Sequence, residues 1–300
     1  MTALDIRAYG DESDSPRHFA LTCVFAPFGT WELFGDDWSQ LLQREPYLTD
    51  AEGYREFHAH DCVQGVGKFS GLDDGYRQRL YREFAEVIQR HHLSAAAMVI
   101  DMEAWPTFAE ILKPLGPTFA KPWPFALAQL LPLVVRLCPP GERIAFLFDD
   151  QQEFKVKAYE GFHALKCSQN PVTSAFRSQL GRIAFDDSRK YPALQAADLL
   201  GYEVRLRMRI ERVPRQSWAR TREQMARIAL GYFGRAVADR WAAVAATAAE
   251  GGKHWTQMSQ EQLTEIASGL PPLEGSEFGD APPLDAFVTH VSDIPTAERE

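Results

Sequence analysis

Residues 194–204 read LQAADLLGYEV and place one acidic residue, Asp198, inside an otherwise apolar segment. Read as a helix, this segment puts apolar residues from Leu194 to Val204 on one stripe at three- and four-residue spacing, so the stripe is expected to pack on a core. Asp198 lies beside that stripe. An ionised carboxylate that loses water without a partner costs several kcal/mol, so the fold is expected to provide one. A hydrogen-bond donor, a nearby arginine and a metal ion are all suitable partners.

The chain has 300 residues, of which 45% are hydrophobic, enough for one large domain or for a domain with an appended helical part. Its 4 cysteines are scattered without a C-x-x-C pair, which argues against a zinc knuckle and a disulfide framework. No secretory leader is recognisable at the N-terminus, and no apolar run approaches the roughly 18 residues of a membrane span. We therefore expect a soluble protein of the reducing cytoplasm.

The formal net charge is −9, which disfavours nucleic-acid binding through bulk charge alone. The charge is uneven, however, because residues 177–227 contain 12 Lys and Arg against 6 Asp and Glu. This segment is therefore +6 and the remainder −15. The arginines beside the Asp198 helix, among them Arg205 and Arg209, form either a solvated face or a phosphate-binding edge.

The N-terminal region is expected to form a hairpin, with strands over 6–9 and 18–25 joined by a polar link. Asp11 and Glu12 would stand at the end of the first strand. Asp and Ser are common in turns, so these acids are either turn residues or the first part of a cation site.

Residues 54–61 are interpreted as a strand that carries Glu56, His58 and His60 on one face. This triplet is compatible with a metal site, although it lacks the further ligands of known zinc hydrolases. The following segment, 65–69, has the wrong glycine spacing for a phosphate-binding loop.

The central region is expected to alternate helices and strands. Expected helices cover 31–44, 73–92, 103–113, 124–137 and 151–165, and expected strands cover 93–100, 143–148 and 181–185. The apolar run 143–148 is typical of a strand covered on both faces, and it ends in Asp149 and Asp150. Open α/β sheets bind ligands at such strand ends, although either acid also suits a helix N-cap. Asp101 ends another buried strand and is the alternative to Asp149.

The C-terminal part is expected to be helical. Residues 216–249 are rich in Ala, Arg and aromatic residues and are interpreted as two helices, whereas the segment after Gly269 is rich in Pro, Gly and acids. We therefore expect a main domain over 1–212, a helical extension over 213–268 and a loosely ordered tail over 269–300.

The positions of three aspartates along the chain lead to one hypothesis about the fold and a metal site. A hairpin, then alternating helices and strands, then a helix bearing an acid is the order of an RNase H-like mixed sheet flanked by helices, in which Asp11, Asp149 and Asp198 would converge. Two carboxylates about 4 Å apart repel by roughly 4 kcal/mol at an intermediate dielectric, so the cluster needs protons or a cation. Oxygen ligands select Mg²⁺ or Mn²⁺ over zinc.

Several short motifs resemble those of a bacterial family, the domain of unknown function 3800. They are Tyr9-Gly10-Asp11-Glu12-Ser13, Glu56-Phe57-His58-Ala59, Phe148-Asp149-Asp150, Asp187-Ser188-Arg189 and Leu194-Gln195-Ala196-Ala197-Asp198-Leu199-Leu200. The resemblance covers about residues 9–212. It implies an RNase H-like, integrase-like fold and metal-dependent cleavage of nucleic acid, in antiphage defence or mobile-element biology.

The resemblance also implies site residues. It gives metal-ligand roles to Asp11, Asp149 and Asp198, with Glu12, Glu56 and His58 as supporting members. One departure is Asp14, which stands where the family usually has glycine.

The resulting hypothesis is a nuclease with two divalent cations, bridged by Asp11 and held separately by Asp149 and Asp198. Glu56 or His58 would handle protons or orient water. Candidate phosphate contacts are Arg189, Lys190, Arg205 and Arg209.

Two rival hypotheses stay open. One is a non-catalytic RNase H-like module that binds a protein or nucleic-acid partner through the C-terminal helices, with Trp218, Tyr232, Phe233 and Trp241 as anchors. The other is a zinc hydrolase built on His58, His60 and an acid.

Overall fold

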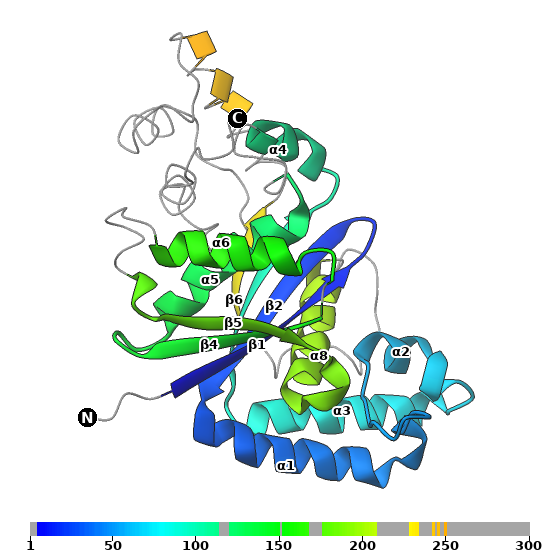
Figure 1. Ribbon diagram of the computed structural model, residues 1–300. Coiled ribbons are helices and arrows are strands. Elements are labelled where there is room, and N and C mark those ends of the chain that lie inside the picture. Colours follow the sequence, from blue (N-terminus) through cyan, green and yellow to red (C-terminus); the bar gives the residue numbers. More distant parts are fainter. Residues whose placement is uncertain are drawn as a thin grey trace.

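The computed structural model describes residues 5–113, 120–150, 152–167, 176–208 and 228–233, with three short pieces at 242–243, 245–246 and 249–250. At its centre is a six-stranded sheet with the order β5-β4-β1-β2-β3-β6 (Figure 1). The strands are β1 (Asp5–Asp14), β2 (His18–Pro27), β3 (Ser94–Asp101), β4 (Arg143–Asp149), β5 (Leu180–Asp186) and β6 (Ile228–Phe233).

The strand directions define the fold class. β1, β2 and β3 form an antiparallel meander, whereas β4 runs parallel to β1 and β5 runs parallel to β4. Strand order 5-4-1-2-3 with these directions is the RNase H-like arrangement. β6 extends the sheet as a sixth strand parallel to β3. The expectation of an α/β, RNase H-like mixed sheet flanked by helices is confirmed.

Helices cover both faces of the sheet (Figure 1). On one face lie α4 (Trp105–Leu112), α5 (Pro122–Leu137) and α6 (Lys155–Cys167). On the other lie α1 (Phe28–Arg44), α2 (Ala59–Gln64), α3 (Asp74–Arg90) and α8 (Pro192–Met208). Of the described helices, none is long and apolar enough to cross a membrane.

The two hydrophobic cores follow from the two-residue period of the strands. On β1, Ile6 and Ala8 contribute to the core under α5, whereas Tyr9 contributes to the core under α8. Successive side chains of a strand point to opposite faces, so Asp11 continues the series of Tyr9 and points toward α8. The alternation therefore determines whether an acid of β1 faces the α5 side or the α8 side of the sheet.

Two glycines let the elements of the site approach one another. A Cβ on Gly10 would lie 2.2 Å from Cε1 of Phe148, so the ring of Phe148 occupies the space that a side chain at Gly10 would need. A Cβ on Gly201 of α8 would lie 3.4 Å from Oγ1 of Thr22 on β2. The absence of a side chain at Gly10 thus leaves room for the ring of Phe148, and at Gly201 it lets α8 lie close to β1 and β2.

Three expectations about local structure are wrong. The first hairpin is longer than predicted, so Asp11 and Glu12 are paired inside β1 rather than standing beyond its end. Residues 54–61 are not a strand: apart from one bridge between Thr49 and Arg55 they lie outside the sheet, and α2 begins at Ala59.

The third error concerns the C-terminal part. Residues 228–233 were expected in a helix, but they form β6, because the outer edge of β3 offers backbone hydrogen-bonding groups that a strand can pair. Tyr232 and Phe233 belong to this strand. Trp218, Trp241, the boundaries near 212 and 268, and the tail after 269 lie outside the described residues.

Candidate functional site

The sheet register places two of the predicted acids on neighbouring strands. Gly10 of β1 pairs with Phe148 of β4, so the next residues along these parallel strands are Asp11 and Asp149. α8 crosses the same region of β1 and β2 and carries the third acid, Asp198. The three aspartates that the sequence brings together by strand order therefore meet at one place.

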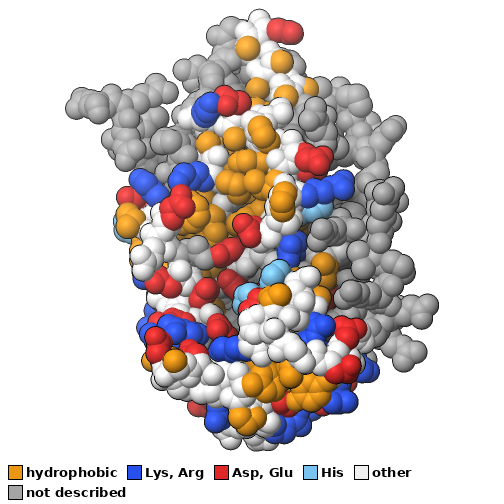
Figure 2. Space-filling view, turned by 90° about the vertical axis from the view of Figure 1, so that its right-hand side faces the viewer, with side chains coloured by type: hydrophobic (Ala, Val, Ile, Leu, Met, Phe, Trp, Pro, Cys, Tyr) orange, Lys and Arg blue, Asp and Glu red, His pale blue; other side chains and the backbone are white. Residues whose placement is uncertain are grey.

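These acids line a cavity of about 500 Å³. Its walls are formed by Asp11, Glu12, Glu56, Phe57, His58, Asp61, Gly67, Lys68, Phe69, Asp149, Ser188, Gln195 and Asp198. Figure 2 shows Asp and Glu side chains gathered next to His side chains around a recess on this face of the molecule. Asp101 is absent from the lining, which favours Asp149 over Asp101 as the member of the cluster.

Burial raises the pKa of each central aspartate, and the charges of neighbouring carboxylates raise those of Asp11 and Asp198 further. Asp11 and Asp198 are 9% and 8% exposed. Burial raises the pKa of Asp11 well above its usual value, and the charges of Asp198, Glu12 and Asp149 raise it further. Burial also raises the pKa values of Asp198 and Asp149. The ionised cluster is therefore unfavourable unless positive charge is added.

Glu12 lies on the opposite face of β1 from Asp11. Its Oε2 accepts a hydrogen bond of 3.4 Å from Nε1 of Trp123 on α5. Burial raises the pKa of Glu12 to about 7, with a smaller contribution from the charge of Asp149. Glu12 thus adds a fourth carboxylate to the cavity from the side of α5.

Gln195 explains why the segment around Glu56 and His58 reaches the site. Its Oε1 accepts hydrogen bonds from Nε1 of Trp38 and the backbone N of Phe57, at 3.0 and 3.1 Å. Its Nε2 donates to the carbonyls of Arg55 and Ser188, both at 3.2 Å. The buried amide of Gln195 therefore holds the segment around Glu56 and His58 against α8 through both its oxygen and its nitrogen.

Asp198 completes this docking from the next turn of α8. Its Oδ2 accepts a 2.8 Å hydrogen bond from the backbone N of Ala59. Gln195 and Asp198 are three residues apart and so lie on the same face of the helix. The Asp198 carboxylate thus has a backbone hydrogen-bond partner as well as a place in the cavity. Its role as a metal ligand stays a prediction.

Ser188, at the start of the 3₁₀ helix η4 (Ser188–Lys190), joins two more acids. Its backbone N donates to Oδ1 of Asp149 at 2.8 Å, and its Oγ donates to Oε1 of Glu56 at 3.1 Å. Burial raises the pKa of Glu56, whereas the hydrogen bond from Ser188 opposes the increase. Glu56 is therefore a half-buried carboxylate at the edge of the cluster.

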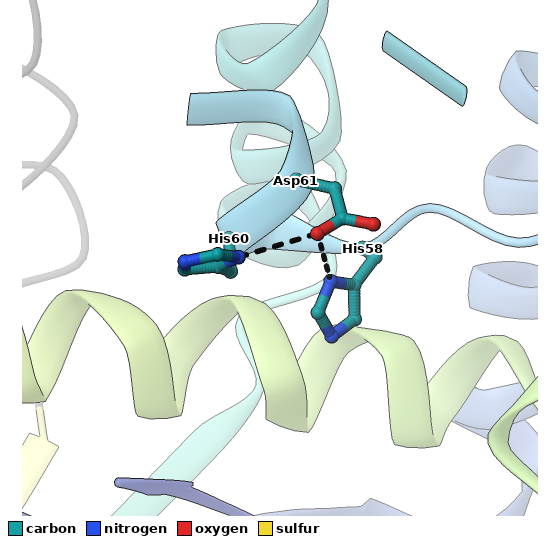
Figure 3. A group of neighbouring side chains, drawn as sticks. All are labelled: His58, His60 and Asp61. Atoms are coloured by element: carbon teal, nitrogen blue, oxygen red, sulfur yellow. Dashed lines mark hydrogen bonds and ion pairs between the residues drawn. The ribbon is translucent and has the colours of Figure 1, made fainter. Parts of the chain in front are cut away.

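His58 lies between the carboxylates of Asp61 and Asp198, and Figure 3 shows its contact with Asp61. Its Nδ1 is 3.3 Å from Oδ1 of Asp61, and its Nε2 is 3.9 Å from Oδ1 of Asp198. Burial lowers the pKa of His58, but the charges of Asp198, Asp61 and Glu56 outweigh burial, so the net shift is upward. The neighbouring carboxylates therefore favour the protonated form of the His58 imidazole.

The predicted phosphate contacts lie in different surroundings. Arg189 pairs with Asp187 at 2.6 Å and with Glu52 at 2.6 Å, and Lys190 pairs with Asp186 at 2.8 Å. The Nε of Arg205 donates to Oγ of Ser13 at 2.9 Å, and Arg205 is buried. Arg209 lies outside the described residues. Their roles at phosphate stay predictions.

The sequence does not single out four polar residues of the cavity, which are Asp61, Lys68, Ser188 and Gln195. Ser188 and Gln195 enter the sequence analysis only as parts of longer motifs. Gln195 carried the one usable signal, because a buried amide needs hydrogen-bond partners as Asp198 does. The positions of Asp61 and Lys68 depend on the path of 54–69, which the sequence pattern misrepresented.

Comparisons with known proteins add little to this geometry. No protein-family model and no curated protein matches the chain. Among solved structures, a chain of the complex of PCNA and RNase HII from Archaeoglobus fulgidus is similar. It is 14% identical with a TM-score of 0.34, and the match covers 74% of this chain and 91% of that one. The fold assignment rests on the strand order and directions.

Proposed function

We propose that this protein is a divalent-metal-dependent nuclease that hydrolyses phosphodiester bonds. The observation that carries the proposal is the convergence of Asp11, Asp149 and Asp198 in an open cavity at the centre of an RNase H-like sheet. In the described part of the chain, no Lys or Arg forms an ion pair with these three carboxylates. The motif resemblance to the domain of unknown function 3800 family supports the same activity, and membership of that family is part of the proposal.

The donor set fits Mg²⁺ or Mn²⁺. The three aspartates, together with Glu12, offer only carboxylate oxygens, which these hard ions prefer. Their pKa values are raised because the buried charges lack compensation, and a divalent ion would supply it. A bound ion of this kind acidifies a coordinated water and stabilises negative charge on phosphate oxygens.

The chain's own residues supply the remaining functions of a nuclease. His58 presents Nε2 toward Asp198, where it can accept or return a proton during hydrolysis. Glu56, fixed by Ser188, can orient a water molecule. Lys68 lines the cavity and donates to the carbonyl of Leu48 at 3.0 Å, which leaves further N–H groups on its ammonium for a phosphate oxygen.

The test is a cleavage screen of the full chain on single- and double-stranded DNA and RNA, with Mg²⁺, Mn²⁺ or EDTA. Cleavage should require the ion, and Asp198→Asn should reduce it at least about 100-fold, because loss of even an outer-shell partner of a metal costs 10- to 100-fold. Asp101→Asn is the matched control: it makes the same change at a buried strand's end outside the cavity, and it should cleave like the wild type.

Two results would contradict the proposal. Cleavage by Asp198→Asn at the wild-type rate would show that the cluster is not the active site. Binding of nucleic acid without any cleavage, unaffected by Asp198→Asn, would instead favour a non-catalytic binding module.

A further inference from the structure

A second group of potential metal ligands lies at the rim of the acidic cavity. His58, His60 and Asp61 come from the start of α2, and each offers one ligand atom within 4.8 Å of the others. In Figure 3 both imidazole rings are directed at the same carboxylate oxygen of Asp61. Their Nδ1 atoms lie 3.3 Å (His58) and 3.2 Å (His60) from that Oδ1.

These separations match the edges of a tetrahedral metal site. Ligand atoms placed about 2.1 Å from a central zinc ion lie about 3.4 Å from one another. The two Nδ1–Oδ1 separations are close to this value, and the ligand nitrogens of His58 and His60 lie within 4.8 Å of each other, so small side-chain adjustments would let the three residues accept an ion. Two imidazole nitrogens and one carboxylate oxygen form the ligand set of several three-residue zinc sites, whereas Mg²⁺ prefers oxygen alone.

The backbone that carries these residues is firmly held. Cys62 and Val63 of α2 are buried, and Nη1 of Arg77 donates to both of their carbonyls, at 2.6 and 2.9 Å. Gly67 has a positive φ of 55°, and a Cβ there would lie 2.8 Å from Oδ2 of Asp61. The absence of a side chain at Gly67 therefore makes room for the Asp61 carboxylate.

The other nitrogen of His58 has the environment expected of a metal-bound histidine. Such residues usually direct their second ring nitrogen at a carboxylate, which fixes the tautomer. Nε2 of His58 faces Oδ1 of Asp198 at 3.9 Å. Nδ1 is then the nitrogen that faces Asp61 and His60.

We propose that His58, His60 and Asp61 bind one zinc-type transition-metal ion at the rim of the cavity. The three ligands are distinct from Asp11, Asp149 and Asp198 and prefer a different metal. His58 belongs to both proposals, however: when Nδ1 holds the ion, Nε2 carries the hydrogen and donates to Asp198, so proton acceptance by His58 applies to the zinc-free protein. Zinc binding does not require the protein to be a nuclease. The alternative is a set of hydrogen bonds from two imidazole N–H groups to one carboxylate, which needs no ion.

The test is a calorimetric titration of metal-free full-length protein with Zn²⁺, in excess Mg²⁺ so that the acid cluster is already supplied. The wild type should bind one equivalent, and Co²⁺ bound at the same position should give a visible d–d spectrum that Zn²⁺ abolishes. His60→Ala should weaken Zn²⁺ binding by at least about tenfold. His60 is half-exposed, so the unfolding midpoint of the metal-free variant should equal that of the wild type.

Asp11→Asn is the matched control, because it removes a carboxylate from the acid cluster and leaves all three rim ligands. It should bind Zn²⁺ like the wild type. The proposal is overturned if the wild type takes up no Zn²⁺, if His60→Ala binds as tightly as the wild type, or if Asp11→Asn loses the ion.

Failure of this proposal and failure of the nuclease proposal give different results. His60→Ala should retain Mg²⁺-dependent cleavage, since His60 is not part of the proposed catalytic set. A protein that binds Zn²⁺ through His60 but never cleaves nucleic acid would contradict only the nuclease.

Discussion

Two groups of acidic side chains lie at the same edge of the sheet, and their pKa values shift in opposite directions. Asp149 and Asp186 are direct neighbours across β4 and β5. Burial raises the pKa of Asp149, whereas the hydrogen bond from Lys190 lowers the pKa of Asp186 to about 2. Arg189 likewise lowers the pKa of Asp187. We call Asp186 and Asp187 the outer acids, and Asp11, Asp149 and Asp198 the inner acids.

The difference shows where the chain supplies its own positive charge. The outer acids are accessible to water and nevertheless have basic partners at 2.6–2.8 Å. The inner acids are more deeply placed and, within the described residues, have only hydrogen-bond donors and His58. An external cation would therefore gain most at the inner acids, where solvent screens charge least.

The outer acids also help to position the residues around the inner acids. Asp187 caps η4 by accepting a 2.9 Å hydrogen bond from the backbone N of Arg189. The first residue of η4, Ser188, donates to Asp149 and Glu56. The outer ion pairs thus hold the short helix that positions two carboxylates of the cavity.

The largest difference between the two groups should appear in cleavage. Asp11→Asn should reduce metal-dependent cleavage at least about 100-fold, because a ligand is lost. Asp186→Asn, the same change on the outer side of Asp149, should reduce it less than about fivefold, because an exposed ion pair contributes at most about 1 kcal/mol. Initial rates at saturating Mg²⁺ measure both. Equal losses in the two variants would remove the distinction between inner and outer acids.

The second-largest difference between the inner and outer acids should appear in how much a divalent ion stabilises the folded protein. At Mg²⁺ or Mn²⁺ concentrations about 100 times the dissociation constant, binding to the folded state adds about 2.7 kcal/mol to the free energy of unfolding. Thermal melts with each ion and with EDTA measure this gain. Asp198→Asn should lose most of it, and Asp186→Asn should keep it. A gain that survives in Asp198→Asn would place the ion elsewhere.

The sequence was sufficient to predict the first five strands of the sheet and the place where the inner acids meet. The buried run 143–148 and the apolar helix around Asp198 have strong periodic patterns, and parallel strand ends lie together in any such sheet. Those patterns depend on local spacing alone. The convergence of Asp11, Asp149 and Asp198 therefore followed from the order of the elements.

The path of residues 54–61 could not be predicted in this way. Alternating side chains there mimic a strand, but the segment is held by Gln195, which lies about 140 residues further along the chain. β6 posed a similar problem, because pairing with β3 outweighs the helix-forming composition around it. Both depend on partners distant in sequence, and so do the positions of Asp61 and Lys68 in the cavity.

Metal-free protein should become less stable as the pH rises from about 4.5 to about 7. The pKa of Glu12 is 4.5 in its ordinary state and about 7 in the folded protein, so the folded state holds a proton that the unfolded state releases. The free energy of unfolding should fall by up to about 1.4 kcal/mol per pH unit for this one proton, and Asp11 acts in the same direction.

Urea unfolding in EDTA across this pH range measures the slope. Glu12→Gln should flatten it, and saturating Mg²⁺ should flatten it as well, since the ion favours the ionised carboxylates. A wild-type stability that rises with pH in EDTA would contradict the uncompensated burial of these acids.

The smallest effect is expected for the outer cations themselves. Lys190→Ala should leave the free energy of unfolding close to that of the wild type, because the Lys190–Asp186 pair is accessible to water and salt. Urea unfolding at low and high salt measures the change, which should shrink as salt increases. Asp186 would lose the partner that lowers its pKa, so NMR titration of its carboxyl should show an upward shift. A large loss of stability in Lys190→Ala would contradict this expectation. It would mean that η4 depends on the exposed outer pairs as strongly as residues 55–57 depend on the buried contacts of Gln195.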